Sequence, residues 1–134
     1  MANSKMSSAL DPLPEVAASY KDGDFRVVET IEVPVVRLDD ALPEHLEIDL
    51  LKVDVQGYEM QVFCGAEQTL ARTRAILLEI NYSEHYKGAA SFDNVYRFLS
   101  SRGFRVFGIS PPYSSAEGPL WADAVFVKDD TLRR

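Results

Sequence analysis

The chain has 134 residues, 46% of them hydrophobic and 26% charged, a composition that predicts one folded domain with a substantial core. Its net charge of −7 and its scattered basic residues exclude a protein that binds nucleic acid through clustered Lys and Arg. No apolar run is long enough to cross a bilayer, and the start has no apolar leader segment, so we expect no membrane partner and a cytoplasmic location.

A single cysteine excludes an internal disulfide framework and is typical of a reducing compartment. Cys64 lies beside Phe63 and close to Ala66. We therefore expect a buried thiol that does not react.

The first third of the chain has weak periodicity. Residues 1–24 contain Ser, Pro, Asp and Gly and predict an arm or loop. Residues 25–38 are rich in Val and Ile but contain Pro34, which cannot donate to a sheet ladder. This stretch predicts either two short strands or one edge strand with a bend. A polar turn with a short helix follows at residues 39–47.

The next segments predict alternating strands and helices. Residues 48–55 carry apolar side chains on both faces over much of their length, which is typical of a strand buried inside a parallel sheet. Residues 57–65 predict a short helix that ends at a glycine, and residues 66–72 predict another. Residues 75–82 predict a second buried strand.

The last third contains the clearest helix of the sequence. Ser91 is suited to be its N-cap, apolar residues recur at helical spacing, and Gly103 follows its last turn. Residues 104–109 and 121–128 predict two more strands without a helix between them, and therefore an antiparallel pair. The whole order predicts an α/β sheet of parallel strands that closes with an antiparallel hairpin.

The segment "LLKVDVQGYEMQVFCGAEQTL", followed by "AILLEI", resembles the FkbM-type methyltransferases, which use S-adenosylmethionine (SAM). The strand ending K-(I/V)-D-x-E-G-x-E, a later G-A pair and a second strand ending in Glu carry the resemblance. The matching positions are Lys52, Val53, Asp54, Gly57, Glu59, Gly65, Ala66 and Glu79. Gln56 stands where the family usually has Glu, but its amide can still donate and accept hydrogen bonds. The preceding "VPVVRLDDAL", with Leu38 and Asp39, is also similar.

The resemblance implies the C-terminal part of a Rossmann-like methyltransferase sheet. The family's glycine-rich SAM loop, D-x-G-A-N-x-G, is absent from this sequence. We therefore expect a truncated fold, with an arm at residues 1–24, a partial methyltransferase domain at 25–130 and a tail at 131–134. With SAM as the implied cofactor, the positions suggested to contact it are Asp54, Gln56 and Gly57.

Two carboxylates end the predicted strands. Asp54 and Glu79 lie at strand ends on the edge where open α/β sheets bind ligands. In an O-methyl transfer a carboxylate can accept the proton of the attacking hydroxyl, and negative charge stabilises the positive sulfonium. Two acids could instead hold Mg²⁺ through oxygen ligands. Glu59 ranks behind these two acids.

Each acid also has a structural interpretation. Asp54 could cap the helix that follows it, and Glu59 could complement the dipole of that helix's first turn. His85 follows the second strand at the presumed ligand edge and is a third catalytic candidate, as a base or an acceptor-binding group. His45 lies in a polar turn and is expected to be exposed. No zinc-ligand spacing is present, and we assign no metal ligands.

The expected truncation has a physical consequence. Without flanking strands, residues 48–55 would expose unpaired backbone groups at an apolar edge. Either residues 26–38 fold back over that edge, or two chains pair there as a homodimer. The expected partners are thus a second copy and a sugar or small-molecule hydroxyl acceptor.

The sequence leaves three functions open. The favoured one is a SAM-dependent methyltransferase fragment that acts on a sugar or small natural product and is inactive or weakly active alone. The second is a non-catalytic α/β module for binding or assembly. The third is a metal-dependent hydrolase that uses Asp54 and Glu79.

Overall fold

The computed structural model describes residues 7–15, 27, 29–116 and 118–130, so most of the expected arm and the tail at 131–134 lie outside the described residues. The helices are α2 (Leu38–Ala41), α3 (Glu59–Cys64), α4 (Glu67–Ala71) and α5 (Phe92–Ser100). The strands are β1 (Ile48–Val53), β2 (Thr73–Asn81), β3 (Phe104–Ile109), β4 (Tyr113–Ser115) and β5 (Gly118–Lys128). None of these helices is long and apolar enough to cross a membrane.

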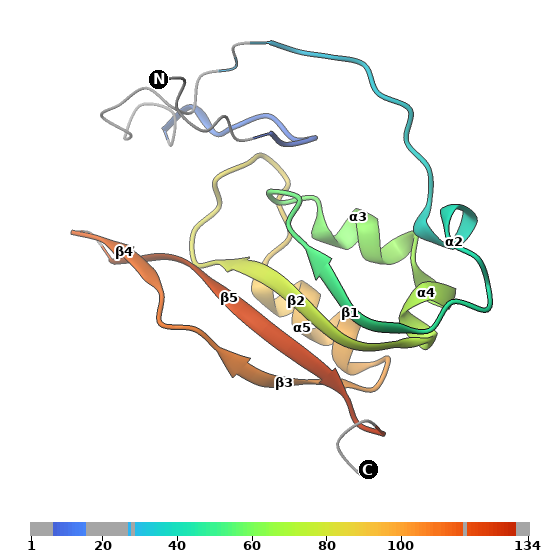
Figure 1. Cartoon of the computed structure of the whole chain (residues 1–134). Helices are drawn as coiled ribbons and strands as arrows, with labels where there is room; N and C mark the ends of the chain where they lie inside the picture. Colours follow the sequence, from blue (N-terminus) through green and yellow to red (C-terminus); the bar gives the residue numbers. More distant parts are fainter. Residues whose placement is uncertain (1–6, 16–26, 28, 117, 131–134) are drawn as a thin grey trace, which may run out of the picture.

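The strands of the described residues form a single sheet in the order β1-β2-β5-β3, with β4 paired to β5 (Figure 1). The β1–β2 pair is parallel, and β5 runs antiparallel to β2, β3 and β4. The predicted α/β class and the antiparallel pairing of the last two long strands are confirmed. β2 and β3 point in the same direction, but β5 lies between them, so most of the pairings are antiparallel.

One face of the sheet carries the hydrophobic core. Side chains from β2 and β5 alternate onto this face, where Ile76, Leu78, Ala124 and Phe126 are buried. Phe63 from α3, Leu70 from α4 and Leu99 from α5 complete the same cluster. Figure 1 shows these helices on one side of the sheet. The small alanines of β5 leave room for the helices to approach closely.

Helix α5 forms where the sequence predicts it. The Ser91 hydroxyl accepts a hydrogen bond from the Asn94 amide at 3.2 Å, which satisfies one orphan donor of the first turn. Val95 and Leu99, four residues apart, are buried against the sheet. Gly103 follows with a φ of 81°, the left-handed conformation that glycine adopts without steric cost.

A long-range cap joins α2 to α4. The Asp39 carboxylate accepts hydrogen bonds from the amides of Gln68 and Thr69 and from the Thr69 hydroxyl, at 2.8–3.1 Å. Burial of Asp39 by itself would raise its pKa, but these hydrogen bonds outweigh it and hold the pKa below its usual value. Asp39, one of the positions that match the FkbM pattern, therefore anchors the N-terminus of α4.

Two expectations for the apolar segments before and within β1 are wrong. The described part of the 25–38 stretch forms no strand, and Ile31, Val33 and Val35 are exposed. β1 is not buried inside the sheet, as its apolar side chains predicted, but lies at the edge, as the expected truncation implied, and Leu50 is 55% exposed. Local β propensity predicted strands at both places, but burial and pairing depend on which segments come to lie beside them.

Two local details also differ from expectation. Gly65 ends α3 with a φ of −92°, so it does not adopt the left-handed conformation of a C′ glycine. Cys64 is exposed, because the helix turns Phe63 rather than Cys64 into the core. His45 is exposed, as predicted.

We propose that two copies pair through the free edge of β1. Replacing Leu50 with Lys should weaken this pairing, because a lysine on an edge strand opposes edge-to-edge association. Light scattering over a concentration series would show dimer for the unchanged chain and a shift toward monomer for Leu50→Lys. Tyr96→Lys, at an exposed position on α5, is the matched control and should leave the mass unchanged. A monomer at every concentration for the unchanged chain contradicts the proposal.

Candidate functional site

Three acidic residues occupy neighbouring register positions near the carboxyl ends of β1 and β2. The parallel register pairs Val53 with Leu78, so Asp54 and Glu79 are the next residues on the two strands. Glu79 is in turn paired with Asp123 on β5. The structure thus brings together the two acids singled out from the sequence and adds a third that the sequence did not suggest.

Asp54 is held in its charged form. Its carboxylate accepts hydrogen bonds from the Lys52 ammonium at 3.0 Å and from the Gln56 amide at 3.2 Å. The Lys52 bond and then the Gln56 bond lower the pKa of Asp54. The interpretation of Asp54 as a helix cap is wrong, because α3 begins at Glu59 and no side chain caps it.

Glu79 has the opposite electrostatic environment. Its side chain is half-buried, and this burial raises the pKa of its carboxyl group. The negative charge of Asp54 raises that pKa further, as do the charges of Asp123 and Glu59, and a hydrogen bond from Asn81 opposes the change. Two neighbouring carboxyl groups therefore have their pKa values moved apart, an arrangement typical of sites with distinct acid–base roles.

Asn81 links Glu79 to His85. Its amide nitrogen donates to the Glu79 carboxylate at 3.5 Å, and its amide oxygen lies 3.2 Å from Nδ1 of His85. Because that oxygen can only accept, Nδ1 carries the proton and Nε2 is the acceptor nitrogen of the ring. His85 is only 8% exposed, and its burial lowers the pKa, which favours neutral imidazole.

A tight turn closes the mouth of β1. Gln56 has a φ of 51° and Gly57 a φ of 98°, both left-handed. The Glu59 carboxylate, 4% exposed, accepts the Gly57 N–H at 3.0 Å, and the Gly57 carbonyl accepts the Ala90 N–H. These bonds give Glu59 and Gly57 a structural role in shaping the turn. Glu59 also lies in the first turn of α3, where the sequence analysis placed it.

A second set of hydrogen bonds covers this turn. The Ser8 hydroxyl donates to the Gln56 carbonyl at 2.8 Å. The Leu13 N–H donates to the His85 carbonyl, and the Lys87 N–H donates to the Asp11 carbonyl. Residues 8–13 therefore lie along the loop after β2 and fix it against the β1 turn. The Tyr86 hydroxyl also donates to the Gln56 side chain, at 3.4 Å.

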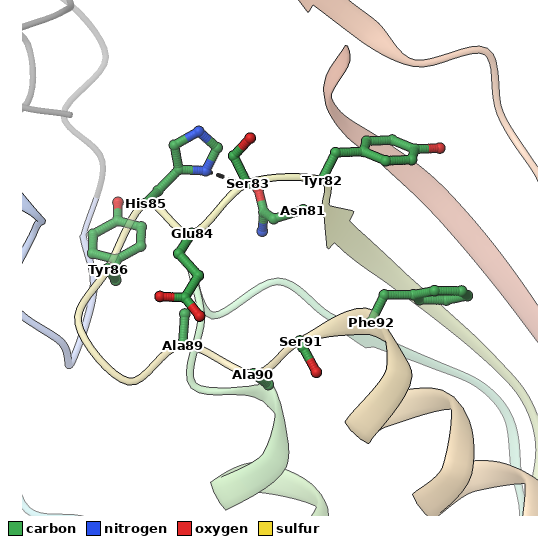
Figure 2. Close-up of a pocket in the computed structure, with 10 residues that line it drawn as sticks. All are labelled: Asn81, Tyr82, Ser83, Glu84, His85, Tyr86, Ala89, Ala90, Ser91 and Phe92. Atoms are coloured by element: carbon green, nitrogen blue, oxygen red, sulfur yellow. Dashed lines mark hydrogen bonds between the residues drawn. The ribbon is translucent and has the colours of Figure 1, made fainter. Parts of the chain in front are cut away.

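Beside this network lies a hollow of about 270 Å³, lined by residues 81–86 and 89–92. Figure 2 shows Glu84 extending between these two segments, with His85 and Asn81 joined by their hydrogen bond at one side. The hollow begins where β2 ends and stops at the first turn of α5. It places the 81–92 loop, rather than the β1 turn alone, at the centre of the candidate site.

The sequence analysis missed two members of the site. These two residues are Asn81 and Asp123, to which no motif in the sequence assigned a role. The alternation of Trp121, Asp123 and Val125 on one strand face was a usable signal. The magnesium site that the sequence left open has no support in the described residues. Among the residues that the structure describes, no group of three or more His, Cys, Asp or Glu side chains lies close enough to hold a metal ion.

Comparison with known proteins adds the family. The FkbM methyltransferase domain matches residues 2–106, which is most of the chain. The chain belongs to the FkbM methyltransferase family. The acids at the ends of β1 and β2 lie in the segment of this chain that resembles the family. No solved structure matches the chain.

One curated relative matches part of this FkbM domain. The 2-O-methyltransferase NoeI of Sinorhizobium fredii (strain NBRC 101917 / NGR234) is 47% identical over 60 residues. The match covers 43% of this chain and 25% of that protein, so the chain spans only a fraction of its relative's length. Its name describes transfer of a methyl group to an oxygen.

The two left-handed glycines of the site allow a test of the turn. Gly57→Ala and Gly88→Ala should each cost about 1–2 kcal/mol, since both positions have a positive φ. A Cβ at Gly57 would lie 2.9 Å from Ala89 Cβ, whereas a Cβ at Gly88 would meet nothing within 4 Å. Thermal unfolding should therefore show a further loss of roughly 1–3 kcal/mol for Gly57→Ala alone. Equal losses would show that close packing against Ala89 is not what position 57 requires.

The two carboxylates predict opposite pH effects. A raised pKa means that folded Glu79 holds its proton to higher pH than in the unfolded chain, so its charge costs stability above that range. Glu79→Gln should stabilise the chain at pH 7, and the gain should vanish in acid, where Glu79 is protonated in both states. Asp54 has a lowered pKa, so Asp54→Asn should destabilise at pH 7 and lose its effect in acid. Denaturant unfolding at pH 7 and pH 3 measures both differences, and effects of the same sign would contradict this assignment.

Proposed function

We propose that this domain belongs to a SAM-dependent O-methyltransferase that acts on a hydroxyl of a sugar or another small molecule, in the cytoplasm. Membership of the FkbM family supports methyl transfer, and the relative's name, which describes a 2-O-methyltransferase, supports oxygen as the acceptor atom. The single observation that carries the proposal is the raised pKa of Glu79 beside the low-pKa Asp54 at the edge where ligands bind. We further propose that the described sheet is the C-terminal part of a Rossmann-like methyltransferase sheet.

The side chains at the β1 turn fit one part of the cofactor. SAM carries a positive sulfonium, and the Asp54 carboxylate, kept ionised by Lys52 and Gln56, has the complementary charge. Asp54 and Gln56 would face this end of SAM, whereas the backbone of Gly57 is already engaged by Glu59 and Ala90. SAM supplies an electrophilic methyl group when it is bound.

Glu79 is the proposed general base. Burial and the neighbouring negative charges raise the pKa of Glu79, which makes it a stronger base than an ordinary carboxylate. The acceptor hydroxyl would donate a hydrogen bond to the Glu79 carboxylate. It would pass its proton to this carboxylate as its oxygen takes the methyl group and the methyl–sulfonium bond breaks, which leaves a neutral thioether. Asn81, hydrogen-bonded to both Glu79 and His85, holds the carboxylate in place for this step.

Calorimetric titration with SAM tests the first part of the proposal. We expect micromolar binding to the unchanged chain and at least a tenfold weaker affinity for Asp54→Ala, because the sulfonium loses its counter-charge. Absence of heat at millimolar SAM would contradict binding by this chain. It would then favour the alternative of a non-catalytic binding or assembly module.

The same preparation tests the base. With radiolabelled SAM and a mixture of neutral methyl glycosides, Glu79→Gln should lower kcat by roughly 10²-fold or more and leave SAM affinity within about twofold. Equal kcat for the variant and the unchanged chain would remove Glu79 from this role. Glu44→Gln, which changes an exposed carboxylate in the turn before β1 and away from the site, is the matched control and should retain kcat.

A further inference from the structure

An exposed aromatic pair lies at the end of the sheet nearest the site. Tyr113 on β4 and Trp121 on β5 are register partners, and their rings stack with centroids 5.4 Å apart at 19°. Tyr113 is 59% exposed and Trp121 is half-buried. Figure 1 shows β4 along the end of β5 that lies beside the end of β2. Such a pair leaves a flat apolar surface in contact with solvent.

This pair shares a sheet face with the acids of the site. Trp121 is paired with Asn81, and two residues further along β5 Asp123 is paired with Glu79. Directly paired residues of antiparallel strands point to the same face, as do residues two apart on one strand. The four side chains thus form a compact array on one face, and Tyr113 extends the aromatic row. Successive rows lie about 7 Å apart along the strands.

The array has the chemistry of a sugar site. An aromatic ring can cover the apolar C–H face of a pyranose, and carboxylate and amide oxygens accept hydrogen bonds from its hydroxyl groups. Few polar groups beside an apolar surface are typical of small-molecule sites that fix one orientation. Asp54, Glu79 and Asp123 add negative charge, and the whole chain carries −7. That field disfavours uronic acids and sugar phosphates.

We propose that Trp121 and Tyr113 form a stacking platform for a neutral pyranose and that Asp123 and Asn81 accept its hydroxyl hydrogen bonds. The platform places one edge of the sugar toward Glu79. This inference rests on the proposed methyltransferase function for its biological meaning, but the binding it describes needs no SAM.

Trp121 is the only tryptophan of the chain, so its fluorescence reports on the platform directly. We would titrate the chain, without SAM, with methyl glucoside, methyl galactoside and methyl mannoside, and in parallel with methyl glucuronide and glucose 6-phosphate. We expect a saturable emission change with at least one neutral glycoside and a much weaker response to both anionic sugars. A dissociation constant of roughly 100 mM is far weaker than that of ordinary small-molecule sites. The proposal is overturned if no neutral glycoside gives a saturable change up to that concentration.

Variants connect the signal to the stacked pair. Tyr113→Ala should weaken the affinity for the neutral glycoside roughly 3- to 10-fold, and Tyr113→Phe should retain it, because a phenyl ring preserves the stack. Asp123→Asn should weaken binding of the neutral glycoside and reduce the discrimination against the anionic sugars. Tyr96→Ala, at an exposed tyrosine on α5, is the matched control and should change nothing. Equal affinity for Tyr113→Ala and Tyr96→Ala, or equal binding of glucuronide and glucoside, would overturn the platform.

The readout separates the two proposals. Sugar binding without SAM binding would support the platform and contradict the methyltransferase assignment for this chain. SAM binding without a sugar response would do the reverse. Far-UV circular dichroism of each variant, which reports on secondary structure and not on the Tyr113–Trp121 stack, distinguishes lost binding from lost folding.

Discussion

The position of β5 between β2 and β3 is the constraint on which the rest of the structure depends. β2 and β3 point the same way, and β5 satisfies the backbone hydrogen bonds of both by running antiparallel between them. Its alternate residues Ala122, Ala124 and Phe126 fill the centre of the core under the helices. Its other face brings Asp123 beside Glu79 and Trp121 beside Asn81. One strand thus organises both the core and the candidate site.

Electrostatics at this edge gives similar residues different roles. Asp54 and Glu79 are both carboxylates at strand ends, but Lys52 and Gln56 stabilise the charge of Asp54, and burial among like charges destabilises that of Glu79. A half-buried acid without a cation partner costs stability, and proteins retain such costs mainly where function requires them. The hydrogen bonds through Asn81 and the segment at residues 8–13 help to hold the loop that carries this arrangement.

Two exposed surfaces of the domain are unfavourable in water and are not covered by other described residues. β1 presents a free edge with Leu50 exposed, and the Tyr113–Trp121 pair presents an apolar platform. The two differ in what they can accept. A strand edge pairs with another backbone. A stacked pair of rings beside carboxylates suits a small ligand with one apolar face and several hydroxyl groups. The pairing proposed for β1 and the ligand proposed for the ring pair therefore involve different parts of the sheet, since β1 is an edge strand and β5 lies between β2 and β3.

The sequence by itself determined the elements whose signals are local. Ser91, the apolar spacing after it and Gly103 define α5, and the apolar runs define β2, β3 and β5. The motif from Lys52 to Glu79 determined the family and placed two acids at neighbouring strand ends. Only the tertiary structure decided that residues 29–37 form no strand, that Cys64 is exposed, and that Asn81 and Asp123 join the site. These outcomes depend on pairing between segments far apart in the chain, and such pairing leaves little trace in the local pattern of either segment.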